Sequence, residues 1–392
     1  MFFTIFYFVL IGFFLGIFTG LVPGIHPNAV ALLVSSMFIE NPFLTSVLIL
    51  SMAVTHTFLD FIPSMVMGVP DPDTALSVLP GHRLLLEGAG YEALYLTVIG
   101  GIVSMIIIIL LLPPLAFSLG SVFWIIEKNI QWILIAIVTF MFLKDRNVRS
   151  ILIFLASGII GLMTINGNVF GNNVLFPMLT GMFGVSSIVY SLFKNVKIPA
   201  QSISTGIFEG KKLLFGGLVG TLSGILVGLL PGVGAAQATF LSQQVLRSKS
   251  ERGFLVAIGG VNTTVAIMSI VSLFLVGKTR TGVGKIISEI TEMNMTNMLI
   301  MLAVIIFVVG IASVSTLYLG RIIYRNIDKI SYRKMNFFTL IVLSALVLYL
   351  NGGYGLLLMV VSGFIGLTTI LLGVRRSYLM GCLILPTILF FL

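Results

Sequence analysis

The stretch "GIFTGLVPGIHPNAVALL" at residues 16–33 places a Pro-Gly pair inside an apolar run, and "GILVGLLPGVGAAQATFL" at residues 224–241 repeats the arrangement. Proline removes a backbone N–H and disrupts the helical turn before it, while glycine permits backbone conformations that other residues resist. The apolar stretch after each pair is too short to cross a bilayer core, which needs about 20 residues. The two matched breaks therefore predict re-entrant helical hairpins that turn at Pro-Gly.

Composition predicts that the chain lies in a membrane. The 392 residues are 58% hydrophobic and 9% charged, whereas soluble domains carry about a quarter charged residues. The apolar runs are continuous rather than alternating, which favours α-helices over a β-barrel. We expect an all-α polytopic protein of the cell (plasma) membrane, with about 10–12 spanning helices. Residues 1–20 are expected to be a retained helix, since the first Lys or Arg is Arg83 and a signal peptide opens with positive charge.

The net charge of +9 comes from short basic clusters between apolar runs. The positive-inside rule assigns such clusters to cytoplasmic loops, so the charge does not indicate a nucleic-acid partner. Basic residues flank the second Pro-Gly segment on both sides, as expected for a hairpin that opens toward the cytoplasm. The remaining clusters are Lys144, Arg146 and Arg149; Arg321, Arg325, Lys329, Arg333 and Lys334; and Arg375 with Arg376.

The internal similarity extends beyond the Pro-Gly pairs. Residues 11–24 align without gaps on residues 219–232 and share glycines at every fourth position. A polar segment follows each proline ("THT" at 55–57, "NTT" at 262–264), and a second break follows that ("GVPDPD" at 68–73, "GKTRTG" at 277–282). We expect two repeats, 1–200 and 205–392, joined by a linker at about 194–212 and inverted relative to one another, a plan typical of secondary transporters.

The Pro-Gly breaks suggest an anion site. A helix that begins after such a break presents free N–H groups and a positive dipole end, which suit a carboxylate. The alternative is a simple proline kink whose freed backbone groups form hydrogen bonds with neighbouring helices. The substrate-binding candidates are Pro23, Gly24, His26 and Asn28 in the first copy, and Pro231, Gly232, Gly234 and Gln237 in the second.

The polar segments suggest a cation site, because clustered side-chain oxygens suit a hard cation such as Na⁺. Interhelical hydrogen bonding explains the same residues equally well. His56 and Asp60 also stand out, since ionisable groups are costly inside apolar runs. The coupling-ion candidates are Thr55, Thr57, Asp60, Asn262, Thr263 and Thr264; the gate or charge-recognition candidates are Asp71, Asp73, Lys278 and Arg280. No enzyme motif, no cofactor and no metal beyond Na⁺ is expected; the coupling ion is Na⁺ or H⁺.

At these residues the chain resembles the TctA family, the large membrane subunit of tripartite tricarboxylate transporters. The resemblance rests on "GLVPG" (20–24), "GLLPG" (228–232) and "GVPDPDTALSVLPGHRLLLEGAGYEAL" (68–94). It implies ion-coupled import of carboxylates, by a fold in which paired hairpins hold the substrate in a moving domain. Where the family usually has Glu-x-x-Asn-Asn and Gly-x-Pro-Gly, this chain reads "GGVNTT" (259–264) and "VGKTRTG" (276–282), which retains only Asn262.

The function expected from these patterns is secondary active transport of a small di- or tricarboxylate-like anion by alternating access. Two alternatives stay open: a carrier or flippase of a lipid-linked phosphate on the same fold, and a membrane assembly subunit without cargo. The expected partners are the small anion and membrane lipids. By analogy a homodimer is expected, and the family resemblance adds a small membrane subunit and a substrate-binding protein.

Overall fold

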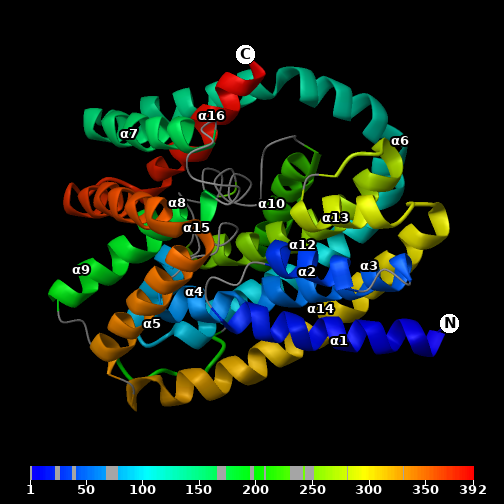
Figure 1. The fold of residues 1–392 in the computed structure, drawn as a ribbon, viewed down its shortest axis with the longest axis horizontal. Coiled ribbons are helices and arrows are strands. Elements are labelled where there is room, and N and C mark those ends of the chain that lie inside the picture. The colour runs from blue at the N-terminus through cyan, green and yellow to red at the C-terminus, as the bar shows by residue number, and fades with distance from the viewer. Residues whose placement is uncertain are drawn as a thin grey trace.

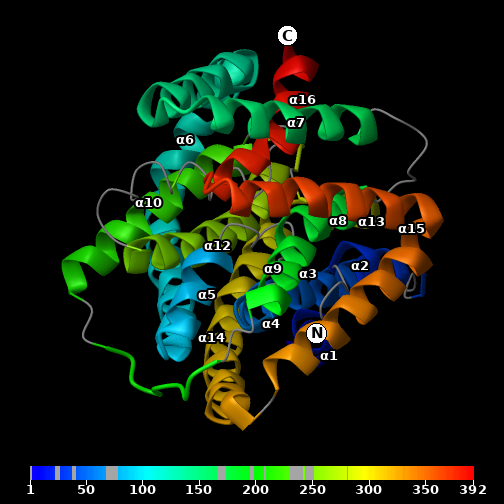
Figure 2. The same cartoon turned by 90° about the vertical axis from the view of Figure 1, so that its left-hand side faces the viewer.

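The computed structural model describes residues 2–22, 27–37, 41–67, 78–165, 174–194, 198–206, 209–229, 242, 251–279, 281–329 and 331–392. Within these ranges every regular element is a helix, which confirms the all-α class (Figures 1 and 2). The first half contains α1 (Phe2–Leu21), α2 (Pro27–Met37), α3 (Pro42–Leu59), α4 (Phe61–Met67), α5 (Val78–Leu86), α6 (Gly90–Asp145), α7 (Val148–Ile165), α8 (Leu175–Leu179), the π-helix η2 (Thr180–Val185) and α9 (Ser186–Lys194).

The helices of the second half follow an extended segment at 198–206. That half contains α10 (Gly210–Leu229), α12 (Glu251–Val276), α13 (Gly282–Ile290), α14 (Met295–Asn326), the 3-10 helix η3 (Ile327–Lys329), α15 (Tyr332–Leu371), the 3-10 helix η4 (Arg376–Met380) and α16 (Gly381–Phe391). The division into two inverted repeats, with boundaries at 1–200 and 205–392, stays a prediction.

Seven helical stretches of the described residues are long and apolar enough to cross a membrane. Three shorter apolar stretches accompany them, at Lys128–Leu143, Leu175–Tyr190 and Arg376–Phe391. The polytopic membrane class is therefore confirmed. The seven longer stretches are Phe2–Leu21, Pro42–Val66, Gly90–Phe117, Val148–Ile165, Glu251–Val276, Met295–Lys329 and Asn336–Leu371.

Two expected spans, at 93–119 and 129–143, belong to the single helix α6. It runs for 56 residues with Pro113 and Pro114 inside. At about 1.5 Å per residue, a straight helix of that length would far exceed a hydrocarbon core of about 30 Å. Figure 1 shows that α6 arches instead of running straight. Its prolines remove two N–H donors from the helical ladder, which makes bending less costly at that point.

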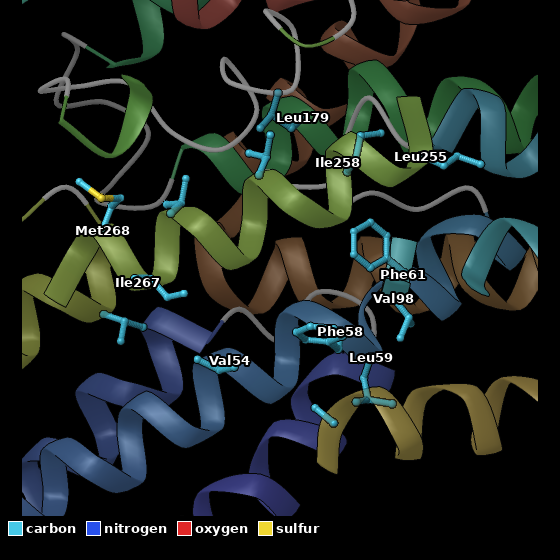
Figure 3. Close-up of a cluster of buried hydrophobic side chains, with 14 of the residues drawn as sticks. Val54, Phe58, Leu59, Phe61, Val98, Leu179, Leu255, Ile258, Ile267 and Met268 are labelled. Carbon is cyan, nitrogen blue, oxygen red and sulfur yellow. The ribbon is translucent and has the colours of Figure 1, made fainter. Parts of the chain in front are cut away.

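The helix α12 forms the centre of the core. Every residue from 253 to 265 is buried, and α6 and α10 pack along it. Apolar side chains fill the space between α3 and α12, among them Val54 and Phe58 of α3 and Ile267 of α12 (Figure 3). The long helix α14 packs on α3 just as α6 packs on α12. Each long helix therefore packs on the helix that carries the polar segment of the other half.

The approach of α6 to α12 is as close as two backbones permit. A Cβ atom on Gly259 would lie 1.9 Å from the Thr97 carbonyl oxygen, and one on Gly100 would lie 2.0 Å from the Val256 carbonyl oxygen. Small residues at such contacts drive helix association in membranes, where lipid is as apolar as the helices themselves. The glycines therefore determine the distance between these helices.

Replacing Gly259 with alanine should destabilise the protein by about 1–3 kcal/mol, because the added methyl group meets backbone rather than a movable side chain. The matched control is Gly310→Ala in α14, where no described atom lies within 4 Å of the added Cβ. We expect a lower melting temperature for Gly259→Ala only. Equal melting temperatures for the two variants would contradict the close contact.

Candidate functional site

Each half of the chain packs a glycine-rich helix against the helix that carries its polar segment. In the first half, a Cβ on Gly16 of α1 would lie 2.5 Å from the Thr55 Cβ of α3. In the second half, a Cβ on Gly224 of α10 would lie 2.6 Å from the Thr264 Cβ of α12. Thr55 and Thr264 thus occupy matching positions, each directly opposite a glycine from the repeated sequence.

Three of the six coupling-ion candidates carry buried polar atoms without a hydrogen-bond partner in the described part of the chain. These atoms are the hydroxyl oxygens of Thr55 and Thr264 and both amide atoms of Asn262. Thr55 and Thr264 are 0% exposed and Asn262 is 5% exposed. Burying an unpaired polar group costs free energy, so native proteins rarely retain one without a ligand, a water or a functional reason.

The other three candidates have partners among the described residues. The Thr57 hydroxyl donates to the Val54 carbonyl (2.8 Å), and the Thr263 hydroxyl donates to the Gly259 carbonyl (3.2 Å). The carboxylate of Asp60 accepts from the Ser64 hydroxyl at 3.1 Å and is 7% exposed. A hydroxyl that donates its proton keeps lone pairs for a cation, so these contacts are compatible with ion binding.

Gly101 of α6 lies between a residue that directly follows the first polar segment and a residue of the second. A Cβ on Gly101 would lie 2.8 Å from the Phe58 ring of α3 and 2.9 Å from the Thr263 hydroxyl of α12. Phe58 follows Thr55 by three residues, and Thr263 lies between Asn262 and Thr264. Phe58 of α3 and Thr263 of α12 therefore lie against the same glycine of α6.

The buried side chain of His56 ties α1 to α3 beside Thr55. Its Nδ1 atom lies 3.1 Å from the Thr19 hydroxyl, which donates to the Gly16 carbonyl at 3.3 Å. The tautomer of the His56 ring determines which of these two groups donates. The sequence pattern singled out His56 but missed Thr19. The signal available in the sequence was the position of Thr19, a polar residue inside an apolar run about one helical turn before the Pro-Gly pair.

Three hydroxyl groups form a hydrogen-bonded cluster at the break that follows α12, at residues 277–282. The Ser269 Oγ lies 2.8 Å from the Thr279 Oγ1 and 2.6 Å from the Thr281 Oγ1. Thr281 also caps α13 by accepting from the Gly284 N–H. The sequence pattern emphasised Lys278 at this break, and that side chain is exposed. The hydroxyls were missed although a threonine before a short amphipathic helix is an N-cap signal.

Asn28 is the one substrate-binding candidate that the structure describes. It lies in α2 against the start of α13, where a Cβ on Gly282 would be 2.5 Å from the Asn28 Nδ2. A candidate of the first copy therefore meets the second break of the second copy. The remaining substrate and gate candidates lie outside the described residues: Pro23, Gly24, His26, Pro231, Gly232, Gly234, Gln237, Asp71, Asp73 and Arg280.

Comparison with known proteins identifies the family. Residues 6–381 match the tripartite tricarboxylate transporter TctA family. The chain belongs to the TctA family. It is 30% identical over 387 residues to the uncharacterized protein MJ1079 of Methanocaldococcus jannaschii, an alignment that covers 94% of each chain. No solved structure gives a significant match. Together with its apolar helices, membership makes this protein a multi-pass plasma-membrane component of a tricarboxylate transporter.

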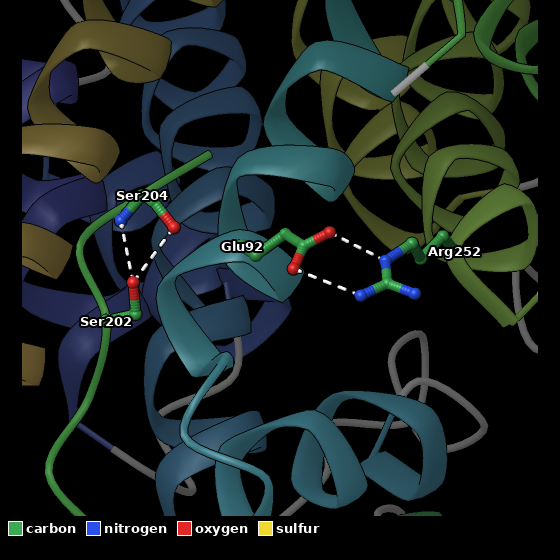
Figure 4. Close-up of polar contacts among 4 residues, drawn as sticks. All are labelled: Glu92, Ser202, Ser204 and Arg252. Atoms are coloured by element: carbon green, nitrogen blue, oxygen red, sulfur yellow. Dashed lines mark hydrogen bonds and ion pairs between the residues drawn. The ribbon is translucent and has the colours of Figure 1, made fainter. Parts of the chain in front are cut away.

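In this TctA family protein, ion pairs link the helices α5, α6 and α12. Arg252 of α12 forms a two-pronged pair with Glu92 of α6, with Nε–Oε1 and Nη2–Oε2 distances of 2.6 and 3.3 Å (Figure 4). Arg83 of α5 pairs with Glu251 of α12. Figure 4 also shows the nearby bond between Ser202 and Ser204 in the extended segment. The pairs join residues about 160 positions apart, a separation that gives no sequence pattern.

Replacing Ser269 with alanine should lower the free energy of unfolding by about 1–3 kcal/mol, because Thr279 and Thr281 each lose a partner. The matched control is Ser288→Ala in α13, whose exposed hydroxyl bonds only to the Lys285 carbonyl among the described residues. We expect a lower melting temperature for Ser269→Ala and little change for Ser288→Ala. A control that is equally destabilised would contradict a special role for the cluster.

Proposed function

We propose that this protein is a secondary active transporter that imports a small di- or tricarboxylate together with Na⁺ or H⁺, by alternating access. One observation carries the proposal: matched glycine contacts hold buried, unpartnered oxygens of Thr55 and Thr264 at corresponding places, in a chain of the TctA family. A scaffold without cargo has no evident use for such costly groups. A coupled transporter does, because they become satisfied when the ion binds.

The proposed ion site combines Thr55, Asn262 and Thr264 as principal oxygen donors. Hydroxyl and amide oxygens suit a hard cation, and helix-packed threonines supply them without a formal charge. Thr57 and Thr263 contribute lone pairs in this arrangement. Asp60 is the candidate proton carrier for H⁺ coupling, since a buried carboxylate inside a membrane is costly when charged and accepts a proton readily.

The proposed substrate site lies at the two Pro-Gly breaks. Asn28 supports it, because it lies in the first turn of α2 and contacts the start of α13. Free N–H groups at helix N-termini stabilise carboxylates. In this proposal the substrate contacts are Pro23, Gly24, His26, Asn28, Pro231, Gly232, Gly234 and Gln237, and the charged residues at the second breaks, Asp71, Asp73, Lys278 and Arg280, act as gates.

The proposed partners follow from membership of a tripartite transporter family. A small membrane subunit and a substrate-binding protein would complete such a system. A homodimer is proposed by analogy with transporters that move one domain against a fixed one.

The test is thermal stabilisation of the purified protein by succinate, malate, citrate and a prenyl phosphate, each with and without Na⁺. A ligand that binds the native state raises the melting temperature by mass action. A sodium-dependent increase with one of the acids would support the proposal and name the cargo class. An increase with prenyl phosphate alone would favour a lipid carrier, and no response from any ligand would favour an assembly subunit.

Asn262→Ala and Thr264→Val should each raise the sodium concentration needed for half-maximal stabilisation by about tenfold, since each removes an ion ligand worth about 1–3 kcal/mol. Without sodium their melting temperatures should equal or exceed that of the wild type, because an unsatisfied buried group is removed. The control is Ser51→Ala, whose buried hydroxyl donates to the Val9 carbonyl at 2.7 Å. It should lose stability and keep the sodium dependence. Unchanged sodium dependence in all three variants would refute the ion site.

A further inference from the structure

Arg376 is a buried arginine without a carboxylate partner among the described residues. It lies in η4 at the start of the α16 segment and is 8% exposed. The ion pairs of the described chain involve Arg83, Lys212, Arg252 and Arg375 instead. Removing one partner from a buried ion pair is strongly destabilising, because it leaves an uncompensated charge. Arg376 is a charge of this kind, without a carboxylate partner among the described residues.

No carboxylate among the described residues forms an ion pair with Arg376. The residues of η4 lead into the N-terminus of α16, the end of a helix that carries a positive partial charge. The carboxylate of Asp145 is engaged by Arg375 and by the Tyr378 hydroxyl at 2.7 Å. Burial lowers the pKa of His82 in α5, the bond to the Met65 carbonyl opposes this, and the charge of Arg376 lowers it further.

One nitrogen of Arg376 makes both of its hydrogen bonds to the described residues. Nη1 donates to the Ser187 hydroxyl at 2.6 Å and to the Phe183 carbonyl at 3.4 Å. Ser187 in turn donates to the Phe183 carbonyl at 2.5 Å. These bonds hold one side of the guanidinium and leave Nε and Nη2 for another acceptor. The hydroxyl of Ser377, 3% exposed, likewise has no hydrogen-bond partner in the described part of the chain.

The guanidinium is anchored on an unusual backbone. Phe183 belongs to η2, a π-helix of six residues, and π-helical turns occur frequently at functional sites. The charge of Arg376 also reaches His82 of α5, whose ring bonds to the Met65 carbonyl of α4. Met65 directly follows Ser64, the partner of Asp60.

We propose that Arg376 binds a carboxylate group of the transported anion, with Nε and Nη2 as a two-pronged donor and Ser377 as an additional one. The assignment rests on the proposed transport function and names the residue that recognises the charge of the cargo. An arginine edge matches a carboxylate with two parallel N–H···O bonds, which a lysine does not reproduce. The bound anion would supply the missing counter-charge.

The experiment compares Arg376→Gln with Arg375→Gln in the purified full-length protein, titrated with succinate, citrate and inorganic phosphate in sodium buffer. Arg375 is the matched control because it is adjacent, 43% exposed and paired with Asp145. For Arg376→Gln we expect a melting temperature without ligand at or above the wild-type value, and an acid concentration for half-maximal stabilisation raised about tenfold or more. Arg375→Gln should keep the wild-type concentration.

Other results would overturn the assignment. An unchanged acid concentration for Arg376→Gln would reduce Arg376 to a structural link between η4 and α9 while leaving the transport proposal standing. A wild-type response to phosphate alone, lost in Arg376→Gln, would assign the site to a phosphate instead. A wild-type protein that responds to none of the anions would remove the transport proposal itself. Should Arg376→Gln fail to fold, Arg376→Lys decides: it keeps the charge without the fork, so weaker acid binding supports the assignment and unchanged binding refutes it.

Discussion

The contact on which the rest of the structure depends is the close approach of backbones at glycine around α12. In lipid, apolar side chains gain little by leaving one apolar surface for another, so packing and hydrogen bonding hold helices together. The carbonyl oxygens of Thr97 and Val256 face Gly259 and Gly100 at distances that exclude any side chain. This packing leaves Thr264 0% and Asn262 5% exposed. Their polar groups have no hydrogen-bond partner in the described part of the chain.

Much of this arrangement could be predicted from local spacing. Glycines at every fourth residue lie on one face of a helix, which favours close packing of the helices α1 and α10. The alignment of the two copies also places the two polar segments at similar distances along the chain from their Pro-Gly pairs. The structure bears out the spacing: Gly16 meets Thr55, and Gly224 meets Thr264. These features are readable because a helix repeats every 3.6 residues, so one face can be followed along the chain.

Contacts between the halves could not be predicted in the same way. The proximity of Asn28 to Gly282 and the pair of Glu92 with Arg252 depend on which helices become neighbours. No short-range pattern specifies that choice. The helix α6 illustrates a related difficulty: the apolar runs at 93–119 and 129–143 read as two separate spans, yet they belong to one helix that arches and contains a double proline.

Arg376 shows how a correct rule can mislead at one residue. The positive-inside rule placed Arg375 and Arg376 together in a cytoplasmic loop. The structure separates them: Arg375 is exposed and paired, whereas Arg376 turns inward against a π-helix. Adjacent residues on a tight helical turn point in different directions, so one side chain can be buried while its neighbour is exposed. Charge statistics describe a cluster and cannot say which member is buried.

The unsatisfied groups of the ligand-free protein are of two complementary kinds. Thr55, Asn262 and Thr264 supply oxygens that suit a cation, whereas Arg376 supplies donors and a positive charge that suit an anion. In the proposed mechanism each ion removes an unfavourable term that its own site carries. Any coupling between the two sites would be reciprocal, so each ion would change the affinity for the other by the same factor. In this proposal, binding only one of the two ions leaves the polar groups of the other site without partners. The closed protein would therefore be favoured with both ions bound or with neither.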